Sequence, residues 1–94
     1  MLNIMDKLMV EEWIGKEARI VGAANPALIG LFGRIIDETL HTLVLRTPSG
    51  PKTVPKNGTT FEITAEDGHP VLVEGSDALV RAHERSKKLY RKIR

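Results

Sequence analysis

The sequence predicts a mainly β fold: a small, strongly bent antiparallel sheet that closes toward a barrel, preceded by one helix and followed by a basic helix. Five short β-rich runs lie within about 60 residues, separated by turn residues, and no interval could hold a crossover helix. The chain has 94 residues, of which 41% are hydrophobic. We therefore expect a single domain over residues 1–94, with one modest core.

The first predicted element is a helix over residues 4–14. Apolar residues recur there at helical spacing, while charged residues occupy the other face. Asn3 suits the N-cap, and Gly15 suits the end. The apolar face either packs on its own domain or binds a protein partner. The candidates for a partner contact are Leu8, Met9, Trp13 and Ile14.

The barrel is predicted over residues 17–81. Its strands are expected in the runs ARIVG, LFGRIID, TLVLRT, TFEIT and VLVEG. Alternation in the third and fourth runs places Leu43, Leu45, Phe61 and Ile63 on one face. We expect this face to form the core, and we expect Phe32 to be buried with it.

Glycines and prolines indicate where the sheet bends or stops. Gly30 and Gly33 flank the second run and predict a bulge or sharp bend. The segment PSGPKTVPKNG contains Pro48, Pro51 and Pro55. Because proline cannot donate a ladder hydrogen bond, this segment is predicted to be a loop rather than a central strand.

The segment after Gly75 is compatible with two structures. Ser76 or Asp77 could cap a helix, whereas the apolar pair that follows suits a returning strand. We favour a strand at Ala78–Arg81. A basic helix or tail is then expected over residues 82–94, with a thin apolar stripe.

The charge is distributed unevenly. Residues 1–80 hold seven Lys and Arg against eleven Asp and Glu, a net charge of −4, whereas residues 81–94 carry a net charge of +6. This asymmetry points to nucleic acid or another anionic surface, although a basic terminus can also serve solubility alone. With only four aromatic residues, we expect phosphate contacts rather than base stacking. The candidate RNA-binding residues are Arg34, Arg46, Lys52, Lys56, Arg81, Arg85, Lys87, Lys88 and Arg91.

No catalytic or metal-binding motif is found. The chain has no cysteine, and its three histidines are far apart without metal-ligand spacing. Asp37 and Glu38 are adjacent on a predicted strand, so their carboxylates point to opposite faces and do not form a Mg²⁺ site. No phosphate-binding loop or nucleophile motif occurs. The sequence also lacks a signal peptide and a membrane-length apolar run, so we expect an intracellular soluble protein.

Several segments together resemble a known family. GLFGRIIDETLHTLVLRT, KTVPKNGTTFEI and VLVEG, with EEWIG before the first strand, are similar to ribonuclease P protein component 1, an archaeal subunit with a small Sm-like barrel. The Asp37–Glu38–Thr39 turn and the Val54–Pro55–Lys56 loop carry most of this resemblance, which runs from Leu8 to Lys88. The chain departs from the family's pattern at RAHERSKK, where Ala82 and His83 replace a usual proline segment.

The resemblance implies a non-catalytic RNA-binding subunit of ribonuclease P, the ribonucleoprotein that removes 5′ leaders from precursor tRNA. It implies that the RNA supplies the active site and uses Mg²⁺, and that this subunit binds no cofactor. The implied partners are the ribonuclease P RNA, precursor tRNA and a zinc-ribbon protein subunit, which would contact the N-terminal helix and an adjoining strand. The implied location is the cytoplasm.

Two other functions remain open from the residues alone. The first is an Sm-like or SH3-like protein-interaction module whose basic tail keeps it soluble. The second is a small hydrolase or nuclease that acts alone, which we disfavour because no acid, base and metal set converges in the sequence.

Overall fold

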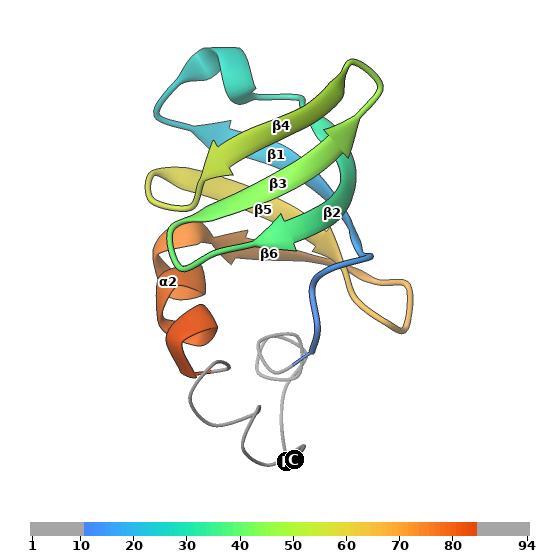
Figure 1. The fold of residues 1–94 in the computed structure, drawn as a ribbon, viewed down its shortest axis with the longest axis vertical. Helices are drawn as coiled ribbons and strands as arrows, with labels where there is room; N and C mark the ends of the chain where they lie inside the picture. Colours follow the sequence, from blue (N-terminus) through green and yellow to red (C-terminus); the bar gives the residue numbers. More distant parts are fainter. Residues whose placement is uncertain (1–10, 85–94) are drawn as a thin grey trace.

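The computed structural model describes residues 11–84, with the backbone alone for residues 80–84. This part of the chain forms one strongly coiled sheet with a helix at its end (Figure 1). The elements in order are β1 (Glu17–Ala23), the 3-10 helix η1 (Pro26–Leu28), β2 (Phe32–Glu38), β3 (Thr42–Thr47), β4 (Gly50–Pro55), β5 (Thr59–Thr64), β6 (Pro70–Glu74) and α2 (Gly75–Glu84).

The sheet is antiparallel throughout, with strand order β4-β3-β2-β1-β5-β6. Figure 1 shows β2, β3 and β4 crossing in front of β1 and β5, so the sheet bends back on itself. The predicted antiparallel β architecture is confirmed. The predicted barrel is not closed within residues 11–84, because the two outer strands β4 and β6 do not pair with each other.

Strand β4 lies where a proline-rich loop was predicted. It pairs with β3 from Thr42 opposite Pro55 to Thr47 opposite Gly50. Its position explains how a strand can contain prolines: at the edge of a sheet, an N–H that is missing on the outer side breaks no ladder. The prolines therefore mark this strand as an edge, which also limits pairing with other chains.

The segment after β6 forms the helix α2, although a strand was predicted there. The predicted strand Ala78–Arg81 lies inside α2, which packs against β5 and β6. Asp77 is in the first helical turn, where a carboxylate interacts favourably with the helix dipole. Ala78 is fully buried. The favoured strand is therefore wrong: the segment forms a helix that places Ala78 in the core.

The predicted N-terminal helix is not seen among the described residues. Residues 1–10, which hold most of it, lie outside the described part of the chain. Residues 11–14 belong to a bend, a coil and a turn instead of a helix. Gly15, with φ at +99°, reverses the chain into β1, and its N–H donates to the Ile35 carbonyl at 2.7 Å.

The sheet bends at positions beside the predicted glycines. The register shifts between Ile20 and Gly22 in β1 and between Ile35 and Asp37 in β2. Gly33 has a different role from the predicted bulge: a Cβ there would overlap the carbonyl oxygen of Arg46. Its missing side chain therefore lets β2 and β3 approach closely.

The core lies on the concave face of the sheet. Leu43, Leu45, Phe61 and Ile63 are all fully buried, which confirms the face predicted from alternation. The prediction that Phe32 is buried is wrong, since this side chain is 52% exposed. Other buried apolar residues of the cluster come from β1, β2, β4, β6, α2 and the segment before β1; they include Trp13, Ala18, Ile20, Ile35, Val54, Val71, Val73 and Ala78.

Candidate functional site

Two of the predicted RNA-binding residues lie next to each other on the outer face of the sheet. Arg34 on β2 is directly opposite Arg46 on β3, and both side chains are exposed. Directly opposite residues share a face of the sheet at Cβ separations of about 5 Å. The Arg34 Nε lies 3.5 Å from Glu17 Oε2 on β1, in a solvent-exposed ion pair that contributes little stability. The two guanidinium groups form a local positive surface.

Lys52 lies elsewhere, although it is also exposed. It is opposite Leu45, whose side chain points into the core, so Lys52 belongs to the inner face at the edge strand β4. Arg46 belongs to the outer face. Lys52 and the arginine pair therefore lie on opposite faces of the sheet and do not form one continuous surface.

Lys56 does not reach the surface. Its side chain is completely buried, and its Nζ donates to Glu38 Oε2 at 2.9 Å and to the Ala78 carbonyl at 3.3 Å. The Glu38 side chain is also completely buried. This geometry corrects the expectation that Lys56 contacts RNA: its ammonium joins the end of β2 to α2 and is not accessible to a phosphate.

The remaining basic candidates fall at or beyond the end of the described region. Arg81 is part of α2, but its side chain is not among those described. Arg85, Lys87, Lys88 and Arg91 lie outside the described residues, so their part in RNA binding stays a prediction.

The candidates for a protein contact separate into different environments. Leu8 and Met9 lie outside the described residues. Trp13 is fully buried in the core cluster, whereas its neighbour Ile14 is 44% exposed. Trp13 is therefore a core residue, which agrees with the alternative that the apolar face of this segment packs on its own domain. Ile14 stays available to a partner.

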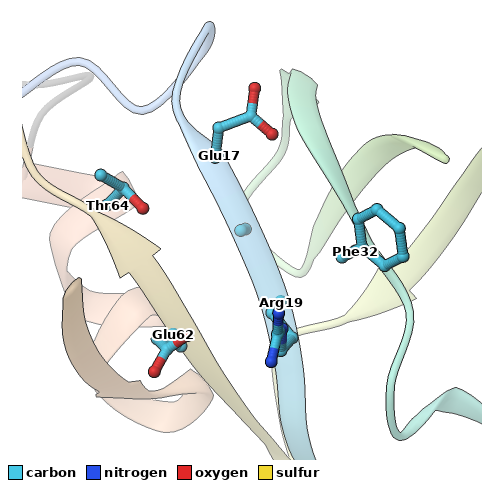
Figure 2. Close-up of a pocket in the computed structure, with 6 residues that line it drawn as sticks. Glu17, Arg19, Phe32, Glu62 and Thr64 are labelled. Carbon is cyan, nitrogen blue, oxygen red and sulfur yellow. The ribbon is translucent and has the colours of Figure 1, made fainter. Parts of the chain in front are cut away.

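A pocket lies on the outer face over β1, beside the arginine pair. Figure 2 shows the Phe32 ring on β2, Arg19 and Glu17 on the neighbouring strand β1, and Glu62 and Thr64 on β5. Arg19 is directly opposite Phe32 on one side and Glu62 on the other. An exposed aromatic ring thus lies beside the Arg19 guanidinium group, with the Glu62 carboxylate across the pocket on β5 and the Glu17 carboxylate paired with Arg34.

Two residues of this face were missed in the sequence analysis, and both carried a signal. In β2, Ile35 is buried and Arg34 is exposed, so a period of two places Phe32 on the exposed face with Arg34. In β1, Arg19 alternates with buried Ala18 and Ile20. Strand parity would have found both, whereas hydrophobicity alone assigned Phe32 to the core.

The acidic and histidine side chains of the described residues do not gather into a metal-ion site. No group of three or more His, Asp or Glu that could hold a metal ion occurs within residues 11–84. Asp37 is exposed, whereas the Glu38 carboxylate turns inward to Lys56, so the two carboxylates diverge. No helix in this part of the chain is long and apolar enough to cross a membrane.

Comparisons with a protein family, with related sequences and with a solved structure all agree with one another. Residues 6–88 match the family model described as ribonuclease P/MRP, subunit p29. The chain is 41% identical over 81 residues to "Ribonuclease P protein component 1" of Desulfurococcus amylolyticus, covering 85% of this chain and 88% of that protein. It is 42% identical over 62 residues to the protein of the same name from Halobacterium salinarum, covering 66% of this chain and only half of that relative. A solved structure of a homologue of the human RNase P protein Rpp29 matches with a TM-score of 0.56 and 33% identity, covering 69% of this chain and 85% of that one.

Proposed function

Since the chain belongs to the ribonuclease P/MRP subunit p29 family and is a protein subunit of the ribonucleoprotein that processes precursor tRNA, we propose that it binds RNA there without catalysing cleavage. The observation that carries this proposal is the exposed pair Arg34 and Arg46 on the outer face of the sheet. Paired guanidinium groups suit phosphate oxygens, which they bind in bidentate geometry. Lys52 can contact RNA only from the other face, at the edge of the sheet.

The partners are proposed at finer detail than the family alone gives. We place the subunit on ribonuclease P RNA and precursor tRNA, with a zinc-ribbon protein subunit contacting the N-terminal segment that includes Ile14. The Mg²⁺ of the reaction is assigned to the RNA catalyst, and the subunit is proposed to need no cofactor of its own. A cytoplasmic location is part of the same proposal.

Replacing both arginines by glutamine is expected to weaken binding to a ribonuclease P RNA transcript and to flatten its salt dependence. Each lost phosphate contact removes about 0.7–0.9 from the slope of log K against log salt, so the double variant Arg34→Gln/Arg46→Gln should lose about 1.5. The measurement is binding by fluorescence anisotropy across a KCl series. The matched control, Arg34→Lys/Arg46→Lys, keeps both charges and should keep the slope. An unchanged slope in the glutamine variant would remove these residues from the RNA contact.

Removing residues 85–94 is expected to weaken RNA binding far more than it lowers the melting temperature. This segment holds six Lys and Arg and no acidic residue. Six cationic side chains placed against phosphates release counterions, so their loss should reduce affinity at low salt about tenfold or more. The control is the same deletion followed by thermal unfolding. Equal affinity of the shortened and intact proteins would contradict the assignment of Arg85, Lys87, Lys88 and Arg91.

A further inference from the structure

Phe32 is exposed in a setting that suits a planar ligand. Its side chain is 52% exposed, while Phe61, the other phenylalanine of the chain, is completely buried. Leaving an aromatic ring of this size in water forgoes the favourable free energy of its burial. The strand register holds the ring on the outer face of β2, so it cannot turn into the core without shifting the whole strand.

Three arginines lie near this ring on the same face of the sheet. Arg19 is directly opposite Phe32 on β1, and Arg34 follows two positions along β2 on the same face. Arg46 lies beside Arg34 on β3. Among residues 11–79, whose side chains the structure describes, no carboxylate lies within 4.0 Å of the Arg19 or Arg46 guanidinium group, so both remain available to an anionic ligand.

We propose that Phe32 is a stacking platform for one unpaired base of a bound RNA, and that Arg19 and Arg46 hold the phosphates on either side of that base. This proposal deepens the RNA-binding function above and rests on it. An exposed ring among arginines matches both parts of a nucleotide, because the base stacks on the ring and the backbone pairs with the charges. Glu17 already pairs with Arg34 at 3.5 Å, which leaves Arg19 and Arg46 for the phosphates. Glu62 lies beyond Arg19 on β5 and repels phosphate, so the backbone passes on the Phe32 side of Arg19.

A protein surface is the other class of ligand that an exposed phenylalanine could serve. The charge pattern favours RNA, because three arginines lie within one or two positions of the ring. An apolar protein partner would instead desolvate these arginines at a cost on binding. Leu72 on the edge strand β6 is 58% exposed in the same row of the sheet but lies beyond Glu62, away from the arginines. It provides a matched apolar control.

The test uses the full chain and a ten-nucleotide single-stranded RNA without self-complementarity, compared with the same strand annealed to its complement. Phe32→Ala should weaken binding of the single strand about 5- to 100-fold, and binding of the duplex by less than twofold, because only the single strand offers a free base face. Phe32→Trp should retain affinity, and its indole fluorescence should be quenched by the single strand. Leu72→Ala should leave both affinities unchanged.

Other outcomes separate this proposal from the function on which it rests. If the intact chain binds neither RNA, the proposed function itself fails. If it binds both but Phe32→Ala or Phe32→Leu binds the single strand as tightly as the intact chain, stacking is wrong while RNA binding stands. If Phe32→Ala retains RNA binding and loses capture of a purified zinc-ribbon subunit, this face is a protein interface and the proposal is overturned.

Discussion

Replacing Lys56 by alanine is expected to lower the free energy of unfolding by about 3–5 kcal/mol, the usual cost of removing one partner of a buried ion pair. The Glu38 carboxylate, which is completely buried, would lose the ammonium 2.9 Å away. The Ala78 carbonyl of α2 would lose a donor as well. For a domain of this size, each kcal/mol corresponds to about 4–8 °C in melting temperature, so a fall of at least about 12 °C is expected.

Two comparisons make this expectation specific to the ion pair. Lys52→Ala removes the same functional group from an exposed position and should change stability by no more than about 0.5 kcal/mol. The double variant Lys56→Met/Glu38→Leu removes both charges and should recover much of the loss, because hydrophobic replacements of a buried pair are often neutral. A Lys56→Ala variant as stable as Lys52→Ala would refute the role of this pair.

The same variant also tests the corrected role of Lys56. Measured below its melting temperature, Lys56→Ala should keep the salt slope of RNA binding, because the lysine it replaces is inaccessible to phosphate. A loss of about 0.7–0.9 from the slope, the value expected for one phosphate contact, would restore Lys56 to the RNA contact. Stability and salt slope thus distinguish a structural lysine from a phosphate-binding one.

The position of Lys56 shows where reasoning from sequence stops. Lysine is rarely buried without a partner, so a lysine in a Pro-rich segment is interpreted as a surface residue. Its partner Glu38 is 18 residues away on another strand, and the acceptor at Ala78 is 22 residues away. These contacts exist only because the coiled sheet brings the end of β4, the end of β2 and the start of α2 together. The pattern of neighbouring residues in the sequence does not show which of these distant segments come into contact.

Strand parity, the alternation of buried and exposed residues along a strand, is the most informative local signal in this sequence. It placed Leu43, Leu45, Phe61 and Ile63 in the core correctly, because alternation in those runs is unbroken. Applied to the second run, the same rule would have exposed Phe32 with Arg34. The proline rule identified residues 50–55 as unsuitable for a central strand, but it did not exclude the edge strand that they form.

The candidate RNA surface could be predicted only in part, because it depends on which strands pair with each other. Charge alone identifies Arg34 and Arg46 as candidates. They are adjacent because β2 and β3 pair as a hairpin, and the short turn between these strands is visible in the sequence. Arg19 joins them through the pairing of β1 with β2, whose intervening segment contains η1 and has no simple hairpin geometry. The pairing of two strands across such a connection can be established only from the three-dimensional structure.

Replacing Trp13 by alanine is expected to destabilise the protein by about 3–5 kcal/mol, as for other fully buried aromatic side chains. Trp13 has no exposed surface and belongs to the core cluster, so its loss leaves a large cavity beside the sheet. The measurement is urea unfolding, in which the midpoint should fall while the slope stays constant. Trp13→Phe should recover part of the loss, because it restores most of the apolar volume.

The neighbouring residue provides the opposite expectation. Ile14 is 44% exposed, so Ile14→Asp should change the unfolding midpoint little, yet it should weaken capture of a purified zinc-ribbon subunit if this segment is the protein contact. Trp13→Phe should leave that capture intact. A Trp13→Phe variant that stays folded and loses the partner would instead place the indole in the interface, which would require the segment before β1 to leave the core when the partner binds.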